Sequence, residues 1–409
     1  MVSVYTCQNG VRIVAEAIPH VRSISVGIWV GAGSRFEAPE ENGITHFIEH
    51  MLFKGTKTRS AKQIAEEFDR IGGEVNAFTT KENTCYYAKV LDHHGELAVS
   101  ILADMFFNST FADEELEKER QVVLEEILMS EDAPDDDIHE QLWQVMYPTD
   151  SLGLPILGSS KTLETFTADT IRNYMEKHYY PENIVISVAG NITKELLVHI
   201  ENLFCPLERS PKAVQQTLTY PTFHSGNFVK NRDVEQSHIA ISYPGVGVND
   251  SNYFSFIAMN NILGGNMSSR LFQEIREDKG LAYTIYSYHS SYADVGSLTI
   301  YGSTNNQQYP LLHKSIDESL LKIKSEGISE IEVDNAKEQL KGSFVLSLEG
   351  TNARMSHNGR NELILGKHLT VDEIIDQIDQ ITLEQVNSLI RQTLSVEPAI
   401  ALIGQNVKQ

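Results

Sequence analysis

The stretch Thr45-His46-Phe47-Ile48-Glu49-His50-Met51 sets two histidines and a glutamate at H-x-x-E-H spacing within an apolar run. On a helix of 3.6 residues per turn, His46 and His50 lie one above the other at i and i+4, so both can reach one metal ion. Glu49 shares that face. Zinc held by two neutral imidazoles and one carboxylate lowers the pKa of a bound water, and a nearby carboxylate can take the proton. The stretch therefore predicts a zinc site with peptide-hydrolysis chemistry.

Candidates for the third ligand lie in the acidic segment from Asp113 to Met129. Its acidic first turn and its apolar residues at helical spacing predict a second long helix. Glu119 and Glu126 are two turns apart on one face of that helix. The other glutamates project at other angles: Glu114, Glu115, Glu117 and Glu125. Acidic residues on a helix commonly form a solvated face, so spacing alone does not choose the ligand.

At this point the chain resembles the M16 or pitrilysin-type metallopeptidases, the inverzincins, in which H-x-x-E-H reverses the thermolysin order. The resemblance extends over essentially the whole chain. In that family the third zinc ligand is a glutamate far downstream of the second histidine, and the family spacing falls on Glu126. The resemblance implies that His46, His50 and Glu126 bind zinc and that Glu49 activates the water. A further family glutamate matches Glu119, which would orient a ligand histidine.

A β-prone segment from Gly72 to Thr80 resembles the substrate-binding edge strand of the family, and Asn83 to Tyr87 follows it. Without the zinc motif nearby, an ordinary hairpin would be the favoured interpretation. An exposed edge offers unpaired backbone groups to which an extended peptide can add as another strand. The residues expected to bind substrate in this way are Asn76, Ala77, Phe78 and Thr79.

Arg276 and Tyr283 lie in an R-x-x-x-G-L-x-Y context that is similar to the family pattern. The resemblance implies that they hold substrate carbonyl groups and help to stabilise the developing oxyanion, which suits a cation and a phenol donor. Taken alone, the segment is equally typical of a surface arginine and a core tyrosine.

The length of 409 residues and the hydrophobic content of 41% are sufficient for two domains, each with its own core. Turn formers place a linker at residues 211–228. A catalytic domain is expected at 1–210 and a second domain, without metal ligands, at 229–409.

The two halves look like diverged copies of one unit, because each opens with an alternating strand and closes with a helix that leads into a strand. Laying Glu49 and His50 over Asn260 and Asn261 puts amides at the ligand and base positions, so the second copy cannot bind zinc in this way. Helices set against largely antiparallel strands, without a steady βαβ rhythm, predict an α+β fold of two homologous sandwich domains.

The formal net charge of −23 argues against a nucleic-acid role, because phosphate binding needs a basic face. It favours basic partners. Family members enclose their site in a chamber, and an acidic wall would concentrate Lys- and Arg-rich peptides. The acidic run at residues 131–137 is interpreted as a solvated loop and helix start.

The three cysteines, Cys7, Cys85 and Cys205, are too few and too scattered for a disulfide framework or a thiolate zinc site. A reducing compartment, the cytoplasm, is therefore expected. Residues 1–20 lack the apolar core of a secretory signal and the Arg- and Ser-rich character of a transit peptide. No apolar run approaches the roughly 20 residues needed to cross a bilayer.

The leading hypothesis is a zinc-dependent endopeptidase that resembles the short-chain, processing-peptidase branch of the family. With one Zn²⁺ per chain, it would cleave unfolded or presequence-like, basic peptides inside a closed chamber. Longer family members carry four related domains, so a chain with two must pair. A homodimer, or a heterodimer with an inactive paralogue, is implied. The alternatives are a non-catalytic subunit of the same fold and a metal storage or sensing protein.

Overall fold

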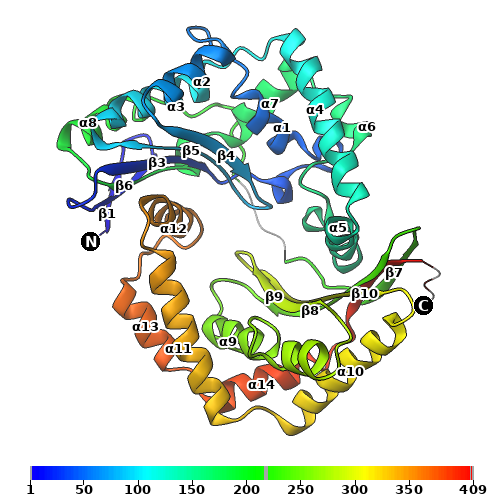
Figure 1. The fold of residues 1–409 in the computed structure, drawn as a ribbon. Coiled ribbons are helices and arrows are strands. Elements are labelled where there is room, and N and C mark those ends of the chain that lie inside the picture. Colours follow the sequence, from blue (N-terminus) through cyan, green and yellow to red (C-terminus); the bar gives the residue numbers. More distant parts are fainter. Residues whose placement is uncertain (1, 216–219, 406, 408–409) are drawn as a thin grey trace. The chain divides into compact units, whose positions relative to one another are not determined.

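The protein is represented by a computed structural model that describes residues 2–215, 220–405 and 407. The chain forms two compact units, each built around one sheet (Figure 1). Unit 1 comprises Met1–Leu128, Leu154–Thr217 and Leu346–Thr370. Unit 2 comprises Met129–Gly153, Leu218–Val345 and Val371–Gln409. Each unit is therefore assembled from three separate stretches of the chain.

Unit 1 contains a six-stranded sheet in the order β1-β2-β6-β3-β5-β4. Neighbouring strands are antiparallel except for the parallel pair β2 and β6. The strands are β1 (Val2–Thr6), β2 (Arg12–Ala17), β3 (Ser23–Val30), β4 (Glu74–Thr79), β5 (Thr84–Leu91) and β6 (Ile184–Gly190). The helices are α1 (Ile44–Met51), α2 (Ala61–Arg70), α3 (Gly95–Asn108), α4 (Asp113–Asp132), α6 (Ser160–Leu163), α7 (Ala168–His178), α8 (Lys194–Phe204) and α12 (Thr351–Ile364).

Both faces of the sheet in unit 1 are covered by helices. Successive side chains of a strand point to opposite faces. Ile28 therefore packs into the large core beneath α1, α3 and α8, whereas Trp29 packs on the opposite face with Met355 of α12. Gly359 of α12 lies so close to the Trp29 indole that a Cβ there would be 2.3 Å from Nε1. Glycine is therefore required for this close packing of helix on sheet.

Unit 2 contains a five-stranded sheet in the order β7-β11-β8-β10-β9. The strands are β7 (Gly226–Asn231), β8 (Gln236–Val246), β9 (Thr284–Ser291), β10 (Val295–Asn305) and β11 (Ala399–Gly404). The helices are α5 (Pro134–Met146), α9 (Tyr253–Leu263), the π-helix η6 (Phe272–Asp278), α10 (Tyr309–Glu326), α11 (Glu330–Ser347), α13 (Val371–Asp379) and α14 (Leu383–Thr393). Helix α5 packs on β7, β8 and β11, and α9, α10 and α14 also contact the sheet or one another.

Five strands follow the same order in both units, and β1 is an additional edge strand in unit 1, which confirms the predicted α+β fold with two homologous sandwich domains. Strand β6 lies between β2, to which it is parallel, and β3, to which it is antiparallel. Strand β11 lies in the same way between β7 and β8. Helix α12 in unit 1 and helix α5 in unit 2 each cover a sheet face.

The compact units differ from the contiguous division at residues 1–210, 211–228 and 229–409. Helix α5 comes from the first half of the sequence but packs in unit 2, and α12 comes from the second half but packs in unit 1. The physical reason is that each sheet has a second apolar face to bury. Local sequence patterns show the apolar face of a helix but not which sheet it will cover. Residues 216–219 of the predicted linker lie outside the described residues.

The expectation about the cysteines is wrong. Cys7 and Cys205, 198 residues apart, form a disulfide, which joins the β1–β2 hairpin to the end of α8. The Asn9 amide donates to the carbonyl oxygens of Phe204 and Leu207 at the same junction.

The acidic run at 131–137 is exposed at Glu131, Asp132, Asp135 and Asp136, as expected for a solvated segment. Asp137 is the exception, because it is buried and pairs with Lys230 at 2.6 Å. The disulfide and this ion pair are long-range pairings that spacing along the chain does not reveal.

Every helix in the described ranges is too short or too polar to span a membrane.

Candidate metal centre

The predicted metal helix is α1, and a buried carboxylate holds its first turn. Gly43 precedes the helix with φ +93°, and a Cβ there would lie 2.7 Å from the backbone of Gly158. The Glu37 carboxylate accepts hydrogen bonds from the backbone N–H groups of Gly43 and Thr45 and from the Thr45 hydroxyl. These bonds satisfy N–H groups that a helix start leaves without intrahelical partners. They also fix the direction in which α1 leaves the loop.

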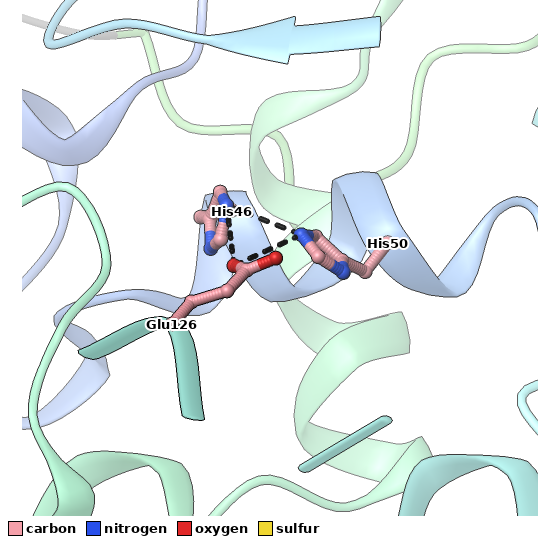
Figure 2. Close-up of side chains that lie close together, drawn as sticks. All are labelled: His46, His50 and Glu126. Carbon is pink, nitrogen blue, oxygen red and sulfur yellow. Dashed lines mark hydrogen bonds and ion pairs between the residues drawn. The ribbon is translucent and has the colours of Figure 1, made fainter. Parts of the chain in front are cut away.

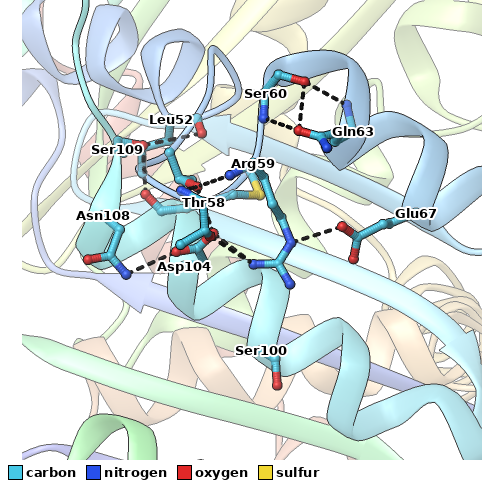
Figure 3. Close-up of polar contacts among 12 residues, drawn as sticks. Leu52, Thr58, Arg59, Ser60, Gln63, Glu67, Ser100, Asp104, Asn108 and Ser109 are labelled. Carbon is cyan, nitrogen blue, oxygen red and sulfur yellow. Dashed lines mark hydrogen bonds and ion pairs between the residues drawn. The ribbon is translucent and has the colours of Figure 1, made fainter.

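The chain that follows α1 is fixed by Asp104 of α3 (Figure 3). The Asp104 Oδ2 atom accepts from the hydroxyls of Thr56 and Thr58, both at 2.7 Å, and from Arg59 Nη1 at 2.8 Å. Asn108 donates to the other oxygen. These bonds hold the carboxyl of Asp104 in its charged form, so its pKa is lowered although burial acts in the opposite direction. The metal helix is thus anchored beyond both of its ends.

The side chains of His46, His50 and Glu126 converge on one point between α1 and α4 (Figure 2). The two Nε2 atoms are 3.2 Å apart, and Glu126 Oε2 lies 3.8 Å from that of His46 and 3.6 Å from that of His50. No other group of three or more histidine, cysteine, aspartate or glutamate side chains in the described part of the chain is arranged to hold a metal.

These distances, 3.2–3.8 Å, lie within about 0.2 Å of those expected around a tetrahedral zinc ion. Bonds of about 2.0–2.2 Å to nitrogen and oxygen place tetrahedral ligand atoms roughly 3.3–3.6 Å apart. Burial lowers the pKa of His46 to about 3, so its imidazole is neutral, as a metal ligand must be. At the 3.2 Å separation of the two Nε2 atoms, their lone pairs would repel unless a proton or a cation lies between them. The donor set and its spacing therefore suit a cation with nitrogen and oxygen ligands.

Glu119 orients one of the two histidines. Its Oε1 atom lies 2.8 Å from His50 Nδ1, and its other oxygen pairs with Lys54. Burial would lower the pKa of His50, but the hydrogen bond to Glu119 and the charges of Glu126, Glu119 and Glu49 outweigh it and raise that pKa. Glu119 holds the proton on Nδ1, which leaves Nε2 to face the metal position.

Glu49 is held by the end of β4. Thr79 Oγ1 donates to Glu49 Oε2 at 2.5 Å. Burial raises the pKa of Glu49, and the Thr79 hydrogen bond partly opposes that rise. A carboxylate with a raised pKa is better matched to accept a proton near neutral pH than an exposed one.

The predicted substrate strand, β4, is the outermost strand of the sheet in unit 1. It pairs with β5, in the register Asn76 with Tyr87 and Phe78 with Cys85. The N–H of Ala77 instead donates to the Asn76 side chain at 2.8 Å. The backbone N–H and C=O groups of Ala77 therefore point away from β5, as do those of every second residue of the strand. Asn76, Ala77, Phe78 and Thr79 thus form an edge that a further strand could extend.

Arg276 and Tyr283 are brought together within unit 2. Arg276 lies on η6 and donates from Nη1 to the backbone oxygen of Tyr283 at 2.8 Å. Its guanidinium carbon lies 4.5 Å from the ring centre of Tyr283 and 4.7 Å from that of Phe272. Both distances fit cation–π contacts, which fix the guanidinium plane while Tyr283 as a whole residue stays 78% exposed.

In the second copy, the positions that correspond to the metal site form a cluster of amides. Asn261 on α9 donates to Gln339 Oε1 at 2.5 Å, and Ser287 Oγ donates to Asn260 Oδ1 at 2.8 Å. The side chains satisfy one another and include no histidine or carboxylate. These positions in unit 2 therefore present amide and hydroxyl groups in place of the histidine and carboxylates of the metal centre.

Two family models match the chain, one after the other along the sequence. The family model "Insulinase (Peptidase family M16)" matches residues 12–160, and "Peptidase M16 inactive domain" matches residues 165–340. The chain belongs to peptidase family M16. A zinc protease of Bacillus subtilis (strain 168), YmxG, described as uncharacterized, is 54% identical over 99% of this chain and 98% of its own length. A second protein described as an uncharacterized zinc protease, from Streptomyces coelicolor, is 39% identical over 98% of this chain and 88% of its own length.

Two solved structures share the M16 fold seen here. A protease from Helicobacter pylori superposes with a TM-score of 0.91 at 21% identity and covers 99% of each chain. A Pseudomonas fluorescens protein titled as a peptidase M16 inactive domain superposes with a TM-score of 0.92 at 19% identity, over 100% of this chain and 99% of that one. At these identities the likeness concerns the fold.

Two side chains of this M16 site were not found from the sequence. Lys54 follows His50 by four residues, one helical turn, and that spacing was the available signal. Glu37 precedes the helix and carries no such signal, because its contacts depend on how the loop folds back over Gly43. The exposed glutamates of α4, including Glu114 and Glu117, take no part in the centre.

Proposed function

We propose that this M16 chain is a zinc-dependent endopeptidase that hydrolyses peptide bonds in unfolded or presequence-like, basic peptides. The observation that supports the proposal most directly is the triangle of His46 Nε2, His50 Nε2 and Glu126 Oε2, with Glu49 on the same helix. A zinc ion bound there would polarise the substrate carbonyl and lower the pKa of a bound water. The relatives named as zinc proteases fit this reading.

The chain's own residues supply the remaining chemistry. Glu49, held by Thr79, takes the proton of the attacking water and returns it to the leaving amine. An extended peptide adds to the open edge of β4 and is held mainly by backbone hydrogen bonds, so many sequences are accepted. Arg276 and Tyr283 bind carbonyl groups of the substrate and stabilise negative charge on oxygen.

The net charge of −23 favours basic peptides, because a negative surface attracts them over long distances. A closed chamber formed by two chains, as a homodimer or with an inactive paralogue, completes the proposal. A cytoplasmic location also stays a prediction, and the Cys7–Cys205 pair removes the support that it drew from cysteine usage.

The test uses a quenched, unfolded, basic peptide. Dialysis against a chelator should abolish cleavage, and stoichiometric zinc should restore it. Glu49→Gln should keep its zinc and lose about 10²- to 10⁴-fold in rate, because the amide preserves shape but cannot accept the proton. Glu117→Gln, at an exposed position on α4, is the matched control and should behave as wild type. A Glu49→Gln variant with more than about a tenth of wild-type activity would contradict the role of this base.

A further inference from the structure

The hydrogen bond between Thr79 and Glu49 joins the edge of the sheet to the reacting centre. We propose that Thr79 is a positioning residue that couples occupation of the β4 edge by a peptide to the orientation of the Glu49 carboxylate. This inference rests on the proposed peptidase function and assigns a new role to Thr79, whose expected role was to bind substrate. In the described part of the chain, Thr79 is the one residue whose side chain hydrogen-bonds the Glu49 carboxylate.

The alternation of β4 explains why Thr79 can reach the metal helix. Val75 and Ala77 pack against the core on the side of α1, whereas Phe78 packs on the opposite face, with its ring 5.5 Å from that of Trp29. Thr79 has the parity of Val75 and Ala77, so its side chain points toward α1. The contacts between α1 and β4 bring the two elements close enough for the hydroxyl to bond the carboxylate.

The same parity places the backbone of Thr79 on the open edge. The Ala77 N–H faces away from β5 and is satisfied by the Asn76 side chain. Backbone groups two residues apart point in the same direction, so those of Thr79 face the same edge. A peptide that adds to β4 would displace the Asn76 amide oxygen and bond this edge. It would thereby fix the backbone that carries the Thr79 hydroxyl.

The consequence for Glu49 is that its two oxygens have different roles. Oε2 accepts the Thr79 hydroxyl, which leaves Oε1 to receive the proton of the water. A glutamate side chain has several rotatable bonds, and holding one oxygen removes much of that freedom. The rate should therefore depend on the hydroxyl, while peptide affinity, which rests on the strand backbone, should not.

Unit 2 offers an internal control for a purely structural role. There Ser287 of β9 donates to Asn260, the residue that corresponds to Glu49, at 2.8 Å. The fold thus brings a strand hydroxyl to this helix position in both units, but in unit 2 the adjacent residue is Asn261, where unit 1 has the histidine His50. Ser287→Ala removes a comparable strand-to-helix bond without touching the proposed chemistry.

The experiment compares Thr79→Val, which keeps the shape and removes the donor, with Thr79→Ser, which keeps the donor, and with Ser287→Ala. Each full-length protein is assayed for zinc content, thermal midpoint, kcat and KM with the quenched basic peptide. Peptide affinity is measured by fluorescence anisotropy in the inactive Glu49→Gln background, with and without Thr79→Val. Wild-type cleavage with zinc is the positive control.

Thr79→Val should lower kcat about 10- to 100-fold, the range typical of residues that orient a reacting group, with KM changed less than about threefold. Zinc content and peptide affinity should match wild type. Thr79→Ser should restore kcat to within about threefold, and Ser287→Ala should leave it unchanged.

The inference is overturned if Thr79→Val keeps wild-type kcat, if it loses zinc, if Thr79→Ser fails to rescue, or if Ser287→Ala lowers kcat equally. Absence of cleavage by zinc-loaded wild-type protein would instead refute the proposed function itself.

Discussion

Removing the charge of Glu119 is expected to weaken zinc binding although Glu119 does not contact the metal position. Its side chain is only 5% exposed, and it accepts from His50 Nδ1 at 2.8 Å while its second oxygen pairs with Lys54. Glu119→Gln keeps the shape and one acceptor, but it replaces a charged acceptor with a neutral one. Glu119→Ala also leaves His50 Nδ1 without this partner.

The magnitude follows from the kind of hydrogen bond that is lost. A hydrogen bond to a charged group contributes about 1.5–3 kcal/mol and a neutral one about 0.5–1.5 kcal/mol. Glutamine should therefore cost about 1–1.5 kcal/mol of binding free energy, close to tenfold in affinity. Alanine should cost up to about 2.7 kcal/mol, which approaches 100-fold and agrees with the usual range for residues that orient metal ligands.

The assay is competition with a chelator of known zinc affinity at fixed pH, which needs no substrate. Glu117→Gln on the same helix, with 65% of its side chain exposed, is the control and should bind zinc as wild type does. Glu126→Ala should lose far more than either Glu119 variant, because it removes a direct ligand. The reasoning fails if Glu119→Ala binds zinc within twofold of wild type or if all variants retain equal zinc.

Three further outcomes are expected. If the active site is shared between paired chains, mixing inactive Glu49→Gln protein with inactive Arg276→Ala protein should partly restore cleavage. The reason is that one site of each hybrid dimer has an intact glutamate base and receives an intact arginine from the partner chain. A mixture that stays inactive after verified subunit exchange would contradict this. The lowered folded-state pKa of Asp104 contributes stability above the unfolded pKa, near 3.9, that is lost as pH falls through the folded pKa. In urea unfolding, Asp104→Asn should therefore cost about 2–3 kcal/mol at pH 7 and clearly less near pH 3, and an equal cost at both would count against the assigned charge. Reduction of Cys7–Cys205 should lower the unfolding free energy by about 2–5 kcal/mol, and an unchanged unfolding midpoint with reductant would show that the bond adds no stability.

The helices and strands could be predicted from the sequence wherever their patterns are local. The acidic first turn and apolar spacing after Asp113 indicated a long helix, and the structure has α4 there. The closing strands β6 and β11 also lie where a helix was expected to lead into a strand at the end of each half. Periodicity reports which face of an element will be buried, and that face is set by neighbouring residues.

The partners of those faces could not be predicted in the same way. The pairing of α12 with the sheet of unit 1, of α5 with that of unit 2, and of Cys7 with Cys205 joins residues that are far apart in the chain. Buried polar contacts such as Asp137 with Lys230 belong to the same class. Their free energy depends on distances that exist only after folding.

The sequence by itself determined the chemistry available to this protein. The i and i+4 spacing of His46 and His50 fixes two imidazoles on one helical face, and the family pattern singled out Glu126 from a helix with several glutamates. Only the tertiary structure decided that Glu126 meets those imidazoles, that Glu119 and Lys54 support them, and that Thr79 holds Glu49. Helical geometry acts over a single turn, whereas α1, α4 and β4 come together only when their apolar faces bury a common core.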